Sequence, residues 1–233
     1  MSLTLYERLA AHDHRPSPFC WRTRFALAHK GLTPEVVAIR FTEADRVAFS
    51  GQAMVPVLVD GDRVVSDSWS IACYLEDAYP QQPSLFGGEG GKALARTLNH
   101  WVDATLQTSL AGILAPALYD ILEPADQAYY RKTREARWGR TFESMRDERE
   151  TYLAAAHTVF EPLRLRLAEA PYICGDAPAY GDYLIFGVFQ WARCTDPQDM
   201  IPAEDDALRT WRDRMLDLYD GLARSVPAFG SAG

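Results

Sequence analysis

The segment that decides the fold is Val55-Pro56-Val57-Leu58-Val59-Asp60-Gly61-Asp62-Arg63-Val64-Val65. Two runs rich in β-branched residues flank an Asp-Gly pair, a composition that favours a tight β-hairpin turn. Pro56 lacks an N–H group, so the first of these strands should begin at the rim of a sheet. Ser66-Asp67-Ser68 follows with side chains that cap helices, and residues 69–75 then place apolar side chains at helical spacing. The segment therefore predicts a hairpin followed by a helix.

The residues before the hairpin predict a strand, a helix and a second strand. Residues 3–9 and 36–39 are short apolar stretches suited to strands. Between them, Ser17 is a suitable N-cap, Pro18 suits the first helical position, and Gly31 suits the position after the helix. This alternation predicts a small α/β domain with a mixed sheet.

After chain breakers at residues 79–83 and 87–91, strand patterns disappear. Apolar residues recur at helical spacing, and the arginine- and glutamate-rich stretches 130–140 and 146–150 are interpreted as solvent-facing helix surfaces. We expect about five or six helices here. The predicted organisation is an α/β domain over residues 1–85 and an all-helical domain over residues 92–233.

Composition excludes several classes of function. The chain has 24 basic and 32 acidic residues and a net charge of −8, which argues against binding a nucleic-acid backbone. Its four cysteines form no CxxC pair, which argues against a disulfide scaffold or a zinc site and favours a reducing compartment. The charged N-terminal stretch does not resemble a signal peptide, and no apolar run approaches the ~20 residues that span a bilayer. We expect a cytoplasmic globular protein that binds neither membrane nor metal.

Three places in the first domain carry residues that can bind or activate a ligand, and each also has a purely structural explanation. Ser17 either caps its helix or also donates a hydrogen bond to an anion held at the helix N-terminus. If Pro56 is cis, the backbone of Val55 is exposed to a peptide-like ligand. Asp67 and Ser68 either begin a helix or also bind an ammonium and a carboxylate. Their combination, rather than any one of them, favours a ligand site.

Four separated stretches resemble cytosolic glutathione transferases, and the resemblance covers nearly the whole chain. Their sequences are similar to those of bacterial β-aryl etherases and fungal etherase-like glutathione transferases. The Trp-Arg-Thr-Arg motif also resembles the zeta class, which includes isomerases. The resemblance implies a thioredoxin-like N-terminal domain with a cis-proline before its third strand, an all-helical C-terminal domain, and a homodimer. The stretches are residues 17–27 (SPFCWRTRFAL), 49–52 (FSGQ), 67–75 (DSWSIACYL) and 186–193 (FGVFQWAR).

The same resemblance assigns roles in binding glutathione, the co-substrate, with no further cofactor. Ser17 would stabilise the glutathione thiolate as the catalytic residue. Val55, ahead of a cis Pro56, would pair with the cysteinyl backbone. The γ-glutamyl end would bind Asp67 and Ser68, and the glycyl end would reach Gln52.

A small apolar electrophile, aromatic in the leading interpretation, would lie between the domains. Five large aromatic side chains are candidates for lining this electrophile site, and we call them the candidate walls. Packing in a core explains such residues at least as well. Two departures from the family pattern stand out: Met54 replaces a lysine that binds the glycyl carboxylate in many relatives, and Ala179 replaces the hydroxyl cap three residues before Asp182. The candidate walls are Phe19, Trp21, Tyr119, Trp138 and Trp191.

The residues leave other functions open. Cys20 lies one helical turn beyond Ser17, which makes glutathione-dependent thiol–disulfide exchange or peroxidase activity conceivable, although a serine in the attacking position cannot form a mixed disulfide. A zeta-like isomerase is a further alternative. A non-catalytic carrier of aromatic ligands is the third, because a fold and a site do not guarantee activity. The leading hypothesis remains a glutathione transferase, with β-aryl ether cleavage as a candidate reaction.

Overall fold

The computed structural model describes residues 2–229, and its N-terminal part contains one four-stranded sheet. The strand order is β2-β1-β3-β4, with β1 parallel to β2 and antiparallel to β3, and β3 antiparallel to β4. The predicted mixed sheet is therefore confirmed. The strands are β1 (Leu3–Arg8), β2 (Glu35–Ile39), β3 (Val57–Asp60) and β4 (Arg63–Ser66).

The hairpin that decides the fold is closed by two residues, Gly61 and Asp62, with Asp60 opposite Arg63. The turn pair is thus Gly-Asp, one residue later than the Asp-Gly pair that the sequence suggested. Gly61 has φ 56, in the left-handed region that glycine adopts without steric cost.

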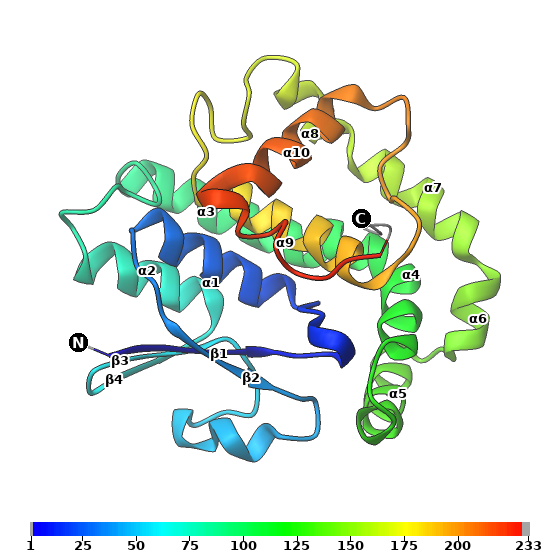
Figure 1. Cartoon of the computed structure of the whole chain (residues 1–233). Coiled ribbons are helices and arrows are strands. Elements are labelled where there is room, and N and C mark those ends of the chain that lie inside the picture. Colours follow the sequence, from blue (N-terminus) through cyan, green and yellow to red (C-terminus); the bar gives the residue numbers. More distant parts are fainter. Residues whose placement is uncertain (1, 230–233) are drawn as a thin grey trace.

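Helices α1 (Pro18–His29) and α2 (Ser68–Ala78) cover one face of the sheet, as Figure 1 shows. Ser17 is the N-cap of α1 and Gly31 has φ 67, so both predicted helix ends are present. Two short 3-10 turns complete this part of the chain, η1 (Ala11–Asp13) and η2 (Ala44–Ser50).

From residue 89 onward, the described chain is helical. A π-helical segment, η3 (Val102–Leu106), continues the first of these helices into the second. The described residues form eight α-helices here, two or three more than the expected five or six, because α6 and α8 are short additional helices. The predicted fold class, a thioredoxin-like domain followed by an all-helical domain, is confirmed. The helices are α3 (Glu89–Trp101), α4 (Gln107–Asp120), α5 (Pro124–Trp138), α6 (Phe142–Asp147), α7 (Arg149–Val159), α8 (Glu161–Leu167), α9 (Tyr180–Thr195) and α10 (Asp206–Gly221).

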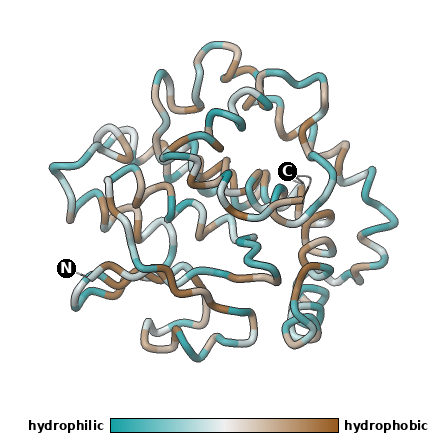
Figure 2. Tube along the Cα trace, in the orientation of Figure 1, coloured by the Kyte–Doolittle hydropathy of each residue, from teal (hydrophilic) through white to brown (hydrophobic). Residues whose placement is uncertain are grey.

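One hydrophobic core runs through both parts of the molecule. The ring of Phe25 in α1 lies 5.3 Å from that of Tyr183 and 5.1 Å from that of Phe186, both in α9. Figure 2 shows hydrophobic residues along the strands, whereas the peripheral helices carry hydrophilic stretches. Because α1 and α9 share this core, the position of Ser17 depends on both domains.

The start of α9 lacks a hydroxyl cap, as the sequence indicated. Ala179 has no capping side chain, and its own N–H donates to Asp182 Oδ2 at 3.2 Å. The buried Asp182 also accepts the N–H groups of Ile173 and Cys174 and the indole N–H of Trp211 at 2.9 Å. Asp182 therefore ties three segments together even though half of the capping box is missing.

Candidate active site

Ser17 lies where the chain leaves the loop after β1 and enters α1. Its Oγ accepts the backbone N–H of Cys20 at 3.3 Å, and its carbonyl accepts that of Trp21 at 3.1 Å. The indole N–H of Trp21 donates to the carbonyl of Arg15 at 2.6 Å. These bonds hold the serine hydroxyl at the positive end of the α1 dipole, where an anion is stabilised.

The buried carboxylate of Glu7 binds two arginines that lie on either side of Ser17 in the sequence. Glu7 in β1 is fully buried and accepts Arg24 at 2.5 and 2.6 Å and Arg15 at 2.8 Å. Both arginines keep some exposure to solvent, so the buried charge is compensated on two sides. Sequence reasoning missed this cluster, because its members are joined only when β1 lies against α1.

The backbone just before β3 lies beside the start of α2. The Val55–Pro56 peptide bond is cis, as the family resemblance implied, and the carbonyl of Pro56 accepts the N–H of Asp67 at 3.4 Å. Asp67 has φ 76 and caps α2 by accepting the N–H of Ser70 at 3.0 Å. A left-handed conformation in a residue other than glycine costs on the order of 1–3 kcal/mol and is typical of binding sites.

A cavity of about 190 Å³ opens beside Ser17. It joins Ser17 and Val55 from the first domain to residues of α4, α5 and α9 from the second, and Figure 1 shows how α5 stands across from the end of β1. Three predicted walls, Phe19, Trp138 and Trp191, line it. A ligand thiol at Ser17 would therefore face an aromatic pocket.

The other two predicted walls lie elsewhere. Trp21 is 1% exposed and packs in the core against Phe25, since its position on α1 faces inward. Tyr119 packs against Phe142, with its ring under the guanidinium of Arg131. Neither residue lines the cavity beside Ser17.

The predicted glutathione contacts Gln52, Pro56, Asp67 and Ser68 are not among the lining residues of this cavity. Asp67 is exposed, whereas Ser68 is buried and its carbonyl accepts the hydroxyl of Tyr180 at 3.0 Å. The exposed carboxylate of Asp67 is accessible to a ligand ammonium, while the backbone of Ser68 also joins the two domains.

Cys20 is buried, and this bears on the redox alternative. Burial, together with the negative charge of the neighbouring Glu7, raises the pKa of the Cys20 thiol to about 11. Redox-active cysteines are instead acidic and accessible. The environment of Cys20 thus argues for a packing role.

Several lining residues were missed by sequence reasoning, notably Gln107 and the arginines Arg8, Arg134 and Arg137. The stretch 130–140 was interpreted as a solvent-facing helix surface. In the structure, its arginine side chains at 134 and 137 face the cavity. Lys132 and Arg137 are exposed as that interpretation implies, whereas Arg134 is half-buried because α5 shares the cavity with β1, which periodicity does not reveal.

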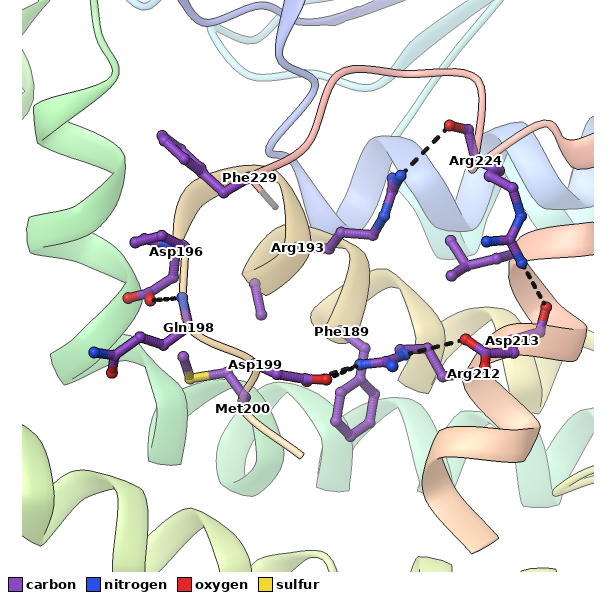
Figure 3. A pocket seen from close by; sticks show the side chains of 13 residues that line it. Phe189, Arg193, Asp196, Gln198, Asp199, Met200, Arg212, Asp213, Arg224 and Phe229 are labelled. Carbon is purple, nitrogen blue, oxygen red and sulfur yellow. Dashed lines mark hydrogen bonds and ion pairs between the residues drawn. The ribbon is translucent and has the colours of Figure 1, made fainter. Parts of the chain in front are cut away.

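A second cavity, of about 390 Å³, lies between the C-terminal half of α9, α10 and the segment around Phe229 (Figure 3). Its charged side chains pair with one another: Arg212 contacts Asp199 at 2.6 Å and Asp213 at 3.7 Å. None of the predicted site residues lines it. We therefore place the candidate active site in the smaller cavity beside Ser17.

The described residues contain no cluster of three or more His, Cys, Asp or Glu side chains placed to bind a metal ion. Over the same residues, no helix is long and apolar enough to cross a membrane.

The mixed sheet with its cis-proline, the helical second domain and the serine at the start of α1 define a class of two-domain protein built on a thioredoxin-like fold. A family model described as the glutathione S-transferase C-terminal domain matches residues 93–219, and one described as the N-terminal domain matches residues 16–78. The first match covers more than half of the chain. The chain belongs to the glutathione S-transferase family.

Individual relatives agree with this membership. Glutathione S-transferase Z1 of Arabidopsis thaliana is 36% identical over 84 residues, which cover 34% of this chain and 38% of that protein. The glutathione S-transferase-like protein ustS of Aspergillus flavus is 25% identical over 172 residues, which cover 69% of this chain and 57% of that protein. The chain thus spans less than two thirds of the length of these curated relatives.

Solved structures show the same fold. A glutathione S-transferase of Ceriporiopsis subvermispora, solved in complex with glutathione, has a TM-score of 0.82 at 23% identity and covers 97% of this chain and 99% of its own. Glutathione transferase GSTFuA3 of Phanerochaete chrysosporium has a TM-score of 0.73 at 23% identity, over 95% of this chain and 92% of its own.

Proposed function

We propose that this protein is a serine-type glutathione transferase in which Ser17 stabilises the glutathione thiolate. The observation that carries the proposal is the serine hydroxyl at the N-terminus of α1, at the edge of a cavity that also contains Val55. The thiolate attacks an electrophilic carbon of a small aromatic molecule held between the domains.

The interactions at this site are sufficient to lower the pKa of the glutathione thiol. A free thiol has a pKa of about 8.5 and is only slightly ionised at neutral pH. Lowering that pKa by about two units requires about 2.7 kcal/mol of preferential stabilisation of the thiolate. One hydrogen bond to a charged group contributes ~1.5–3 kcal/mol, and a helix dipole adds ~0.3–1 kcal/mol.

The rest of the tripeptide binds along the first domain in this proposal. Val55 pairs with the cysteinyl backbone beside cis Pro56, Asp67 and Ser68 hold the γ-glutamyl end, and Gln52 reaches the glycyl end. The exposed carboxylate of Asp67 and the position of Val55 at the cavity beside Ser17 support this arrangement.

Residues 1–85 act as the glutathione-binding domain and residues 92–233 as the domain that supplies the wall of the electrophile site. We further propose a cytoplasmic homodimer, since a two-fold pair is the commonest oligomer. The candidate reaction within this class is cleavage of a β-aryl ether, in which the thiolate displaces a phenolate. The resemblance of residues 17–27 and 186–193 to etherase-like relatives supports that choice.

Two variants distinguish the proposed catalytic role of the Ser17 hydroxyl from its role as a helix cap. Ser17→Gly removes the hydroxyl but costs only a few tenths of a kcal/mol as a cap, and Ser17→Thr keeps both. We expect Ser17→Gly to lower kcat/KM for conjugation of a chloronitrobenzene at least tenfold and to raise the pKa of bound glutathione, measured by thiolate absorbance.

Ser17→Thr should retain most of the activity. Unimpaired turnover and an unchanged thiol pKa in Ser17→Gly would remove Ser17 from the mechanism. Binding of aromatic ligands without turnover of any electrophile in the wild-type protein would instead support the carrier alternative.

A further inference from the structure

The cavity beside Ser17 collects positive charge without any negative charge. Arg8, Arg134 and Arg137 line it, and no aspartate or glutamate does, although the chain as a whole carries a net charge of −8. Among residues 2–229, none of these three arginines forms an ion pair within 4.0 Å, whereas most other arginines do. This distribution is unusual for an acidic protein.

The hydrogen-bond and ring partners of Arg8 and Arg134 are neutral. Arg8 donates to the carbonyls of Ile39 at 3.3 Å and Arg40 at 2.5 Å and lies 4.4 Å above the ring of Phe41. Arg134 lies 4.9 Å from the ring centre of Tyr130 and donates to a hydroxyl in the same helix at 3.2 Å. Such contacts orient a guanidinium but leave its charge uncompensated.

The charge of Arg134 disfavours the charged form of Arg8. Burial lowers the pKa of Arg8, and the positive charge of Arg134 lowers it further. Asp126 is the carboxylate that favours the charged form of Arg8, but one of its oxygens accepts the N–H and the hydroxyl of Thr42 at 2.9 and 2.8 Å. An anion in the cavity would relieve this repulsion.

Two residues that line the cavity each carry a buried polar atom without a partner among the described residues. The indole Nε1 of Trp191, a residue only 6% exposed, and Oε1 of Gln107 are buried and make no hydrogen bond. Leaving such groups unpaired costs ~1–3 kcal/mol each. The rings of Phe19, Trp138 and Trp191 provide apolar contact for an aromatic group.

We propose that the electrophile is an aromatic molecule that carries an anionic group such as a carboxylate, bound by Arg134 and Arg137, with its ring against the aromatic side chains of the cavity. This inference rests on the proposed function, and it names the substrate class. In the reaction, the glutathione thiol releases its proton to water and the sulfur forms a bond to the ring carbon. The leaving group, chloride in the test below, departs with the electron pair of the carbon–halogen bond.

The test compares chloronitrobenzoate with chloronitrobenzamide, which share the same ring, leaving group and nitro group but differ in charge. Arg134→Gln/Arg137→Gln should lower the ratio of kcat/KM for the acid to that for the amide at least tenfold. Lys132→Gln is the matched control, because it removes an exposed charge from α5 outside the cavity. We expect that control to change the ratio less than twofold. Differences in intrinsic reactivity cancel when the ratios are compared between proteins.

Binding provides a readout that does not depend on turnover. Quenching of tryptophan fluorescence by nitrobenzoate and nitrobenzamide should show tighter binding of the acid in the wild type and loss of that preference in the double variant. Equal affinities in the wild type, or an unchanged preference in the double variant, would overturn the inference even if the amide is conjugated normally. A raised KM for glutathione with an unchanged preference between the two aromatics would do so too, because the arginines would then serve the tripeptide. Failure of the wild type to conjugate either compound, with the acid still preferred in binding, would count against the proposed function alone.

Discussion

Gly187 in α9 lies so close to Pro18 in α1 that a Cβ atom at residue 187 would stand 2.6 Å from the Pro18 carbonyl oxygen. This approach lets α9 pack directly against the first turn of α1, which begins one residue after Ser17. The second domain therefore sets the position of the proposed catalytic hydroxyl.

Gly187→Ala should force these two helices apart. Overpacking of this kind costs about 1–3 kcal/mol, and the displacement of the first turn of α1 should raise KM for glutathione. Denaturant unfolding and steady-state kinetics measure the two effects. Gly90→Ala in α3 is the control, because its Cβ would meet no atom within 4 Å. A Gly187→Ala protein as stable and as active as Gly90→Ala would show that this contact does not position Ser17.

Ala179→Ser should stabilise the protein. Ala179 is the extended N-cap of α9, with φ −141, and has no side-chain acceptor. A serine hydroxyl there would accept the N–H of Asp182, which now bonds the Ala179 carbonyl at 2.9 Å, and would complete the capping box, for about 0.5–2 kcal/mol. Urea unfolding measures the gain. Ala177→Ser adds the same hydroxyl outside the cap position and should change the free energy of unfolding far less; equal effects would refute the explanation by capping.

Cys20→Ala should retain conjugating activity. Since burial raises the pKa of Cys20 to about 11, the thiolate is scarce at neutral pH and the thiol is shielded from reagents. Iodoacetamide should therefore modify Cys20 in the native protein more slowly than the less buried Cys73, as followed by peptide mass spectrometry. Rapid modification of Cys20, together with a disulfide reductase activity lost in Cys20→Ala, would revive the redox alternative.

The stability of the protein should depend on His29 at mildly acidic pH. Its Nδ1 lies 2.6 Å from the hydroxyl of Tyr183 and its Nε2 lies 3.1 Å from the carbonyl of Ser84. Burial lowers the pKa of His29 below its usual value of 6.5. The unfolded chain then binds the proton more readily than the folded chain, so the free energy of unfolding falls as the pH drops below about 6.5.

Urea unfolding at about pH 7.5 and pH 5.5 measures this loss. His29→Gln should show a smaller decrease between the two pH values than the wild type, whereas His100→Gln, at an exposed position in α3, should behave like the wild type. The same decrease in all three proteins would show that His29 contributes nothing to the pH dependence.

The sequence by itself determined the local elements around the site. The caps at Ser17 and Gly31 and the hairpin at residues 57–66 are encoded by backbone preferences and hydrogen bonds between residues a few positions apart. Such interactions are visible in a linear sequence because they need no distant partner. The order of these elements, with four family-like stretches, also predicted the two-domain fold.

Only the tertiary structure decided which side chains share the cavity. It brought Trp191 and Arg134 to Phe19 and buried Trp21, two residues further along α1, in the core. It also joined Glu7 to Arg24 and brought Arg134 and Arg137 of α5 to the same cavity as Arg8 of β1. Whether a helix face meets a core, a cavity or water depends on the element packed opposite it, and periodicity alone carries no information about that partner.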